Sequence, residues 1–228
     1  MKKYLMLLLV VLMVGIVGCD NKKTALEFKN DYESVNGVAN KSGKIHRSVT
    51  IDESNKFEEV TAKELLEKIN NQETFYVYFG SKLCPWCRST IEMADKISRE
   101  NGIDKIYYVD IWDDEGNEIL RDKYILNDNN ELVLDIKGAD EYKKFLEVFD
   151  NVLTEYNLTD KDGNKVSTGE KRIYAPNYIY VNKGKAIRLT EGISSLQKDS
   201  REELTDEMLE EEKKLFNEFF PAYCDDLC

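Results

Sequence analysis

The sequence predicts an α/β fold built on a mixed β-sheet. Between residues 61 and 111, a helix, a strand, a second helix and a second strand follow one another, and this alternation needs a crossover between parallel strands. Nearer the C-terminus, two strands separated by a short turn predict an antiparallel hairpin, and an acidic helix follows them. Parallel and antiparallel strands together indicate one mixed sheet that is covered by helices.

The chain begins with a targeting segment that contributes nothing to the fold. Lys2 and Lys3 precede an apolar run of 14 residues, 4–17, whereas a membrane-spanning helix needs about 20. The ending Ile16-Val17-Gly18-Cys19 resembles the lipobox of bacterial lipoproteins, in which cleavage occurs before a cysteine that then carries lipid. The resemblance implies a lipoprotein signal peptide over residues 1–18 and a chain lipid-anchored at the extracytoplasmic face of the cell membrane. A cleaved secretory signal followed by a chance cysteine is the alternative.

A polar tether is expected between the lipid and the folded domain. Residues 19–44 contain few large apolar side chains, although 25–35 can form a short helix. The folded domain is then expected over residues 45–228, which is long enough for one core but short for two. A strand is predicted over 45–51, and it contains His46, the only histidine of the chain.

The charge balance excludes one class of partner. Without residues 1–18 the chain has 30 basic and 44 acidic residues, which gives a formal net charge of −14. Such a surface repels the phosphate backbone of nucleic acids. We therefore expect no nucleic-acid partner.

The first helix and strand of the domain have clear local signals. Thr61-Ala62-Lys63-Glu64 is a capping box, and the apolar residues that follow share one helical face, so a helix is predicted to about Asn70. Residues 74–80 are aromatic and β-branched, which predicts a buried strand. Its tyrosines, and those of the next strand, are expected in the core or on the sheet surface: Tyr76, Tyr78, Tyr107 and Tyr108.

The second helix begins at the motif Cys84-Pro85-Trp86-Cys87. Apolar residues then recur at helical spacing as far as Asn101-Gly102, which is a natural C-terminal stop. Residues 105–111 form the next predicted strand.

The segment 112–171 is interpreted as an insertion. Two short strands, 119–126 and 132–136, are predicted on either side of a turn at 127–130. Apolar residues spaced three and four apart predict a helix over 139–156, so the insertion is expected to be helical in its main part.

The last elements are a hairpin and a helix. Residues 177–181 and 185–190 are predicted strands joined by the turn Asn182-Lys183-Gly184. Ser200-Arg201-Glu202-Glu203 is interpreted as a second capping box, at the start of an acidic helix with Leu204, Met208, Leu215 and Phe219 on one stripe.

The chemistry of the chain is concentrated at Cys84 and Cys87. Cys84 lies where a strand ends and a helix begins, so free N–H groups and the helix dipole favour its thiolate. Pro85 fits the first helical turn, where a missing N–H costs nothing. Cys87 supplies the second thiol that can release a mixed disulfide. Lys82 and Arg88 flank the pair and are expected to favour the thiolate further.

These features resemble the thioredoxin/glutaredoxin superfamily over most of residues 57–220. Cys84-Pro85-Trp86-Cys87 is similar to glutaredoxin-type and oxidase-type motifs, and Ala175-Pro176 stands where the family has a cis-proline beside the cysteines. The resemblance implies a thioredoxin-like three-layer fold, a mixed central sheet flanked by helices, with a helical insertion over about 112–171. It implies Cys84 as nucleophile and Cys87 as resolving thiol. It also implies a substrate-binding set, namely Pro85, Trp86, Ala175 and Pro176.

One position departs from the family pattern. Thioredoxins have a buried aspartate in the strand six residues before the first cysteine, where it accepts the proton of the resolving thiol, and this chain has Tyr78 there. The route of that proton is therefore left open by the resemblance.

Two further cysteines, Cys224 and Cys228, end the chain. A local disulfide without a catalytic role is favoured because the neighbouring aspartates discourage a thiolate; a shuttle to the first pair and two unpaired thiols are the alternatives. All four thiols could instead bind zinc, but the strand–motif–helix context argues against it, and neither a metal nor another cofactor is expected. A static disulfide between Cys84 and Cys87 is a further alternative.

The leading hypothesis is an extracytoplasmic thiol–disulfide oxidoreductase that acts on cysteines of exported proteins or peptides, with a membrane or soluble redox partner. The basic neighbours of Cys84 favour oxidation or isomerisation over reduction. The alternative is a non-catalytic accessory lipoprotein that binds a peptide and assists its export or maturation, since the chain is also similar to bacteriocin-transport accessory proteins. The long insertion and the acidic last helix motivate that alternative.

Overall fold

The computed structural model describes residues 24–221. The predicted signal peptide, Cys19, Cys224 and Cys228 lie outside the described residues. Within residues 24–221, no helix is long and apolar enough to cross a membrane.

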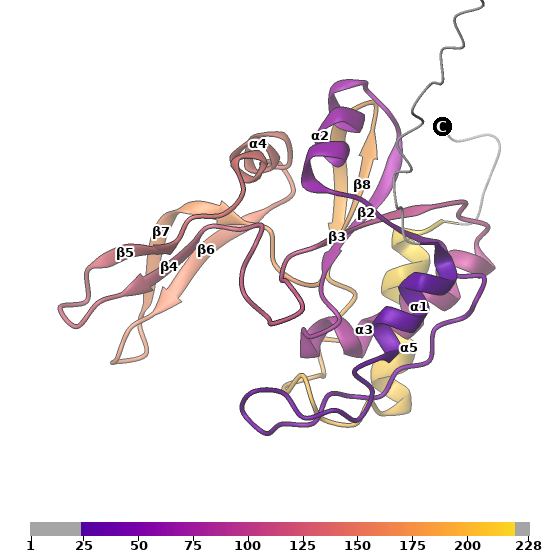
Figure 1. The fold of residues 1–228 in the computed structure, drawn as a ribbon, viewed down its shortest axis with the longest axis horizontal. Coiled ribbons are helices and arrows are strands. Elements are labelled where there is room, and N and C mark those ends of the chain that lie inside the picture. Colours follow the sequence, from indigo (N-terminus) through magenta and orange to yellow (C-terminus); the bar gives the residue numbers. More distant parts are fainter. Residues whose placement is uncertain (1–23, 222–228) are drawn as a thin grey trace, which may run out of the picture.

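A five-stranded mixed sheet forms the centre of the protein (Figure 1). Strands β1, β3 and β2 run parallel to one another, β8 is antiparallel to β2, and β9 is antiparallel to β8. The sheet confirms the predicted α/β class and the predicted hairpin, whereas β1 was not predicted. In spatial order its strands are β1 (Phe57–Glu59), β3 (Ile106–Asp110), β2 (Phe75–Gly80), β8 (Asn177–Asn182) and β9 (Lys185–Thr190).

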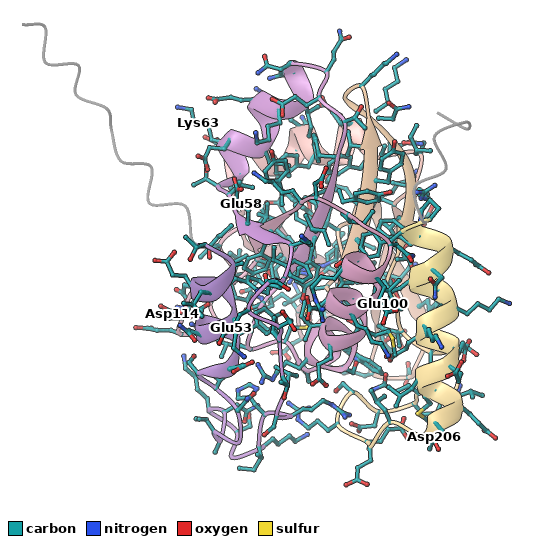
Figure 2. All side chains as sticks on the ribbon, turned by 90° about the vertical axis from the view of Figure 1, so that its right-hand side faces the viewer. Glu53, Glu58, Lys63, Glu100, Asp114 and Asp206 are labelled. Atoms are coloured by element: carbon teal, nitrogen blue, oxygen red, sulfur yellow. The ribbon has the colours of Figure 1, made fainter. Side chains whose placement is uncertain are left out.

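Helices cover both faces of the sheet and produce three layers. One face packs against α1 (Ala25–Glu33), α3 (Pro85–Glu100) and α5 (Asp206–Phe219), and the other packs against α2 (Ala62–Asn70) and α4 (Asp140–Val148). Alternation along β2 separates the two cores, because Tyr78 enters the first and Val77 and Phe79 enter the second. Figure 2 shows α5 along one side of the molecule, with charged side chains on its outer face and Asp206 at its N-terminal end.

The helices α2 and α3 begin where the sequence predicted. Thr61 and Glu64 form the reciprocal capping box of α2, each side chain bonded to the other residue's backbone N–H. Cys84 is the N-cap of α3 and Pro85 its first residue, and the helix ends at Glu100, one residue before Asn101-Gly102. Local chemistry decides both starts, because a side-chain acceptor at the N-cap satisfies an otherwise unpaired N–H.

The N-terminal tether was predicted too long. Thr24 caps α1 through a capping box, and two aromatic residues of this helix, Phe28 and Tyr32, are buried in the first core. Phe28 stacks on Phe57 with ring centroids 4.6 Å apart. The folded body therefore begins near residue 24 rather than at residue 45.

The strand predicted over 45–51 is also wrong. Ile45 makes only an isolated bridge with Ala39, and the segment that follows is irregular. Side chains complete its hydrogen bonds instead: the Asn36 amide accepts from the Val49 N–H at 3.0 Å and donates to the Val49 carbonyl at 2.8 Å. Val49 and Ile51 are buried, so the apolar pattern reflects burial of a loop and not sheet pairing.

The insertion is mainly β-structure, not helical. The predicted hairpin is present as β4 (Lys123–Leu126) and β5 (Leu132–Ile136), and a second hairpin follows as β6 (Thr154–Thr159) and β7 (Lys165–Arg172). We call these four strands the hairpin arm, which projects away from the central sheet in Figure 1.

The helix predicted over 139–156 ends early. Phe149 is the C-cap of α4, and the Asp150-Asn151 pair that follows favours a turn. Tyr156, which continued the apolar spacing, is a buried residue of β6. The apolar residues of α4 and those of β6, separated by a turn, together had the three- and four-residue spacing of one longer helix, and this produced the wrong prediction.

The last helix uses a different cap from the one predicted. Its N-cap is Thr205, whose side chain accepts from the Met208 N–H, and Ser200 lies in the turn before it. Of the predicted stripe, Met208 and Phe219 are buried, Leu215 is half-buried and Leu204 precedes the helix. The other buried residues of α5 are Glu212 and Phe216.

Candidate active site at the Cys84–Cys87 pair

Cys84 and Cys87 lie at the junction of β2 and α3, at the C-terminal edge of the parallel strands. Cys84 has the extended backbone of an N-cap, with φ −76° and ψ 119°, and its sulfur accepts a hydrogen bond from the Cys87 N–H at 3.4 Å. A thiol or thiolate thus takes the capping role that serine or aspartate usually has. Both residues are thiols in this structure, and their side chains are hydrogen-bonded to each other.

The surroundings of Cys84 favour its thiolate. Burial opposes ionisation, but hydrogen bonds from the Cys87 side chain and N–H, the charge of Arg121 and the Trp86 N–H outweigh it, so the pKa of Cys84 is lowered. N–H groups at a helix N-terminus stabilise an anion without a full positive charge. Cys84 is therefore the more acidic thiol of the pair.

Cys87 has the opposite character. Burial and the neighbouring Cys84 raise the pKa of Cys87 well above its ordinary value. Cys87 has no exposed surface, whereas Cys84 keeps 4%. The geometry therefore assigns the first contact with another molecule to Cys84.

The Ala175-Pro176 segment faces the cysteines, as the resemblance implies. The peptide bond between these residues is cis. The Cys84 thiol donates to the Ala175 carbonyl across a distance of 3.5 Å. Trp86 is half-buried and packs at the edge of the first core, so Trp86 and Ala175 both lie next to Cys84.

Lys82 and Arg88 do not face Cys84 as free cations. The Lys82 ammonium is ion-paired with Asp31 and Asp114, at 2.6 Å in each case. Arg88 is completely buried, and its guanidinium donates to the carbonyls of Tyr32 and Lys82 at 2.8 and 3.0 Å. Both cations hold the loops around the motif together, so their predicted electrostatic role is not the main one.

Arg121, although it is also ion-paired, is the basic residue whose charge lowers the pKa of Cys84, and sequence reasoning missed it. Arg121 lies about 37 positions after Cys84 in the chain, just before β4, and it is 5% exposed. Glu118 binds its guanidinium at 2.6 Å, and the Ile173 carbonyl accepts from it at 3.2 Å. No local signal marks this arginine, because only the fold brings the root of the hairpin arm to the cysteines.

Four buried tyrosines lie beneath the pair, from three different elements of the sheet and from α1. The rings of Tyr78 and Tyr178 stack with centroids 4.5 Å apart, and those of Tyr78 and Tyr108 are 5.4 Å apart. The Tyr32 and Tyr78 hydroxyls are 2.7 Å from each other. Tyr78 and Tyr108 confirm the expected core placement, whereas Tyr32 and Tyr178 were not expected near the site.

A half-buried carboxylate, Asp110, ends β3 at the same edge of the sheet. It is the register partner of Gly80, and it accepts from the Trp112 N–H at 3.0 Å. Burial raises the pKa of Asp110 to about 6, although the Trp112 N–H and the nearby Tyr108 and Ser81 hydroxyls act in the opposite direction. Sequence analysis missed this residue, whose only signal is its place at the end of a buried strand.

Within residues 24–221, no group of three or more His, Cys, Asp or Glu side chains is arranged to hold a metal ion. The four-thiolate alternative needs Cys224 and Cys228, which lie outside that range.

Neither a protein-family model nor a curated protein matches this sequence. The geometry around Cys84 and Cys87 is therefore the basis for assigning a function.

Proposed function

We propose that the protein is a thioredoxin-like thiol–disulfide oxidoreductase that acts outside the cytoplasm on cysteines of exported proteins or peptides. One observation supports this most directly: Cys84 caps the N-terminus of α3 with a lowered pKa, while Cys87, one turn further, is fully buried with a raised pKa. An acidic thiol that keeps some exposed surface, next to a fully buried thiol of higher pKa, suits disulfide exchange.

The exchange proceeds in two steps. The Cys84 thiolate attacks one sulfur of a substrate disulfide; the bond between Cys84 and that sulfur forms, and the other substrate sulfur leaves as a thiol after taking a proton. Cys87 then attacks Cys84, which releases the second substrate thiol and leaves a Cys84–Cys87 disulfide. The substrate gains two electrons and two protons, and the pair loses them.

The lowered pKa of Cys84 bears on the direction of the reaction. Stabilising the thiolate stabilises the reduced pair, and this makes the oxidised pair a stronger acceptor of electrons. We therefore favour transfer of the disulfide to substrate thiols, which reverses the two steps. A membrane or soluble redox partner then reoxidises the pair.

The fold supports a thioredoxin-like assignment. Three features support it: a mixed central sheet with helices on both faces, the cysteine motif directly after β2, and the cis Ala175-Pro176 bond directly before β8. Ala175 and Pro176, with Pro85 and Trp86 at the start of α3, would hold the substrate backbone next to Cys84.

Alkylation of Cys84 tests the proposal directly. With the chain from residue 20, we expect iodoacetamide to modify Cys84 at pH 6 at least tenfold faster than a free thiol of pKa about 8.5. Cys87→Ser should keep this reactivity and trap a mixed disulfide with glutathione, whereas Cys84→Ser should abolish both. An ordinary thiol pKa at Cys84 would contradict the proposed function.

The proposed location outside the cytoplasm depends on a lipid anchor at Cys19, which the lipobox-like sequence at residues 16–19 indicates. Cys19→Ser is expected to remove acylation and to release the protein from the membrane fraction. Metabolic labelling with palmitate measures the first effect and cell fractionation the second.

One observation favours peptide binding as a second candidate function. The hairpin arm exposes aliphatic side chains on β5, where Leu132, Val133 and Leu134 are 38–43% exposed. A Cys84→Ser/Cys87→Ser variant separates the two functions: unchanged biological activity would support binding, and loss of activity would support exchange.

A further inference from the structure

Tyr78 reaches the redox pair because Gly80 leaves room for it. A Cβ atom on Gly80 would lie 2.1 Å from the Tyr78 hydroxyl oxygen and 2.2 Å from the ring carbon that bears it, so no larger residue fits beside this ring. The glycine thus lets the Tyr78 side chain fold over the end of its own strand. Tyr78 and Cys87 are both completely buried in the first core, and the Tyr78 hydroxyl acts on the Cys87 thiol by lowering its pKa.

A second tyrosine holds that hydroxyl in place. Tyr32, from α1, is completely buried, and its hydroxyl oxygen lies 2.7 Å from that of Tyr78. The position of Tyr32 is itself supported, because its backbone carbonyl accepts from the Arg88 guanidinium at 2.8 Å. The three groups Cys87, Tyr78 and Tyr32 therefore form one buried polar row in the first core.

The resolving step needs help at Cys87. Burial and the adjacent Cys84 both disfavour the Cys87 thiolate, and the groups that act in the opposite direction are first the Tyr78 hydroxyl and then the Ser81 backbone. Burial also raises the pKa of Tyr78 well above its ordinary value, so the phenol stays protonated near neutral pH. Tyr78 is therefore a donor to a sulfur anion and not a base.

We infer that the Tyr78 hydroxyl donates a hydrogen bond to the Cys87 sulfur as its negative charge develops, with Tyr32 as the positioning residue that orients this hydroxyl. The inference rests on the proposed function and assigns the resolving step to a neutral donor. In that step the bond between Cys84 and the substrate sulfur breaks, the Cys87–Cys84 bond forms, and the Cys87 proton passes to the departing substrate sulfur. Tyr78 keeps its own proton throughout.

Two measurements on Tyr78→Phe test this role. In a Cys84→Ser background, the pKa of Cys87, followed through its 13Cβ chemical shift, is expected to rise by about one pH unit. In the otherwise unaltered chain, the glutathione mixed disulfide of Cys84 should resolve roughly tenfold more slowly, while the first attack of Cys84 on oxidised glutathione changes less than about twofold. Tyr32→Phe should act in the same direction with a smaller effect, about two- to threefold.

Tyr108→Phe is the matched control. It also removes a buried hydroxyl from a ring stacked on Tyr78, but that hydroxyl lies beside Asp110. It should leave the Cys87 titration and the resolving rate unchanged. Equal effects of Tyr108→Phe and Tyr78→Phe, or no effect of Tyr78→Phe, would overturn the inference.

The same experiment separates this inference from the proposed function. If the unaltered chain forms no mixed disulfide with glutathione, the proposed function fails and the inference fails with it. If the mixed disulfide forms and resolves equally fast with and without the Tyr78 hydroxyl, only the role of Tyr78 is wrong.

Discussion

The sulfurs of Cys84 and Cys87 belong to residues one helical turn apart, yet their pKa values shift in opposite directions. The pKa of Cys84 is lowered by hydrogen bonds from N–H groups at the start of α3 and by the positive charge of Arg121. The pKa of Cys87 is raised because this thiol has no exposed surface and because Cys84 is an anionic neighbour once it ionises. Single contacts thus decide which of the two thiols is the more acidic. The same dependence of acidity on surroundings appears at a carboxylate far from the cysteines in sequence, Glu212.

Glu212 should make the protein less stable as the pH rises. Neither of its carboxylate oxygens has a hydrogen-bond partner among the described residues, and burial raises its pKa to about 8, with Arg47 acting in the opposite direction. The folded state therefore holds a proton that the unfolded state loses above about pH 4.5, so the free energy of unfolding falls between about pH 4.5 and 8. The unaltered protein should lose about 4 kcal/mol of stability from this group between pH 5 and pH 9, and Glu212→Gln should not show that loss.

Urea unfolding at both pH values measures this difference. Burial also raises the pKa of Glu92 and Glu191, which adds to the slope of the unaltered chain, so the comparison between the two proteins isolates Glu212. Glu210→Gln, on the exposed side of the same helix, is the control and should follow the unaltered chain. A parallel pH dependence in Glu212→Gln would contradict the prediction.

Gly80→Ala should destabilise the protein through its clash with Tyr78. The added methyl group meets the Tyr78 ring at about 2 Å, and overpacking of a core typically costs about 1–3 kcal/mol. Gly163→Ala is the control, because its turn has a positive φ of 86° but no heavy atom within 4 Å of the added group, so only about 1 kcal/mol of backbone strain is expected. Denaturant titration compares the two, and equal costs would show that the Tyr78 ring can move aside.

At the scale of elements, α1 has a role that its polar composition does not suggest. The helix carries only two buried side chains, but Phe28 packs against Phe57 and Tyr108, and Tyr32 reaches Tyr78. A nine-residue helix is marginal on its own, so this packing accounts for its stability. The surroundings of the Cys84–Cys87 pair thereby depend on a segment that precedes the strand-and-helix pattern predicted from sequence.

The Phe28→Ala variant should unfold at a lower urea concentration than the unaltered protein. Phe28 is 1% exposed and removal of a buried phenylalanine side chain costs about 3–5 kcal/mol. Leu26→Ala on the same helix is the control, since Leu26 is 48% exposed and should cost less than about 0.5 kcal/mol. If urea titration gives similar midpoints for both variants, α1 does not dock on the core as described.

The whole molecule combines a packed three-layer body with the projecting hairpin arm. The body holds both hydrophobic cores, which lie on opposite faces of the central sheet. The β4–β5 hairpin is exposed on both faces over most of its length, and its two strands form a separate two-stranded sheet. At the root of the arm, however, Arg121 forms an ion pair with Glu118, and its charge lowers the pKa of Cys84.

Shortening the tip of the arm should leave the body intact. Replacing residues 125–133 with Asn-Gly removes exposed side chains but retains Arg121, so the melting temperature should change by less than about 4 °C. Alkylation of Cys84 at pH 6 should be unchanged as well. A large loss of stability would show that the arm carries part of the core, and a large loss of Cys84 reactivity would connect the tip to the site.

The sequence by itself determined the elements whose signals are local. Thr61 and Glu64 specified the start of α2, Cys84-Pro85 the start of α3, and the aromatic strand 74–80 a buried position, because capping and alternation act within a few residues. The cysteine pair and its place at a helix N-terminus followed from the same kind of signal.

Only the tertiary structure decided which distant residues surround that pair. Arg121, Tyr32 and Asp110 carry no local mark of their roles, and they meet at the site because the parallel strands end at one edge and α1 packs beneath it. The misassigned helix over 139–156 and the misassigned tether have the same physical reason. Apolar spacing records that side chains are buried, but the partner against which they pack depends on the whole fold.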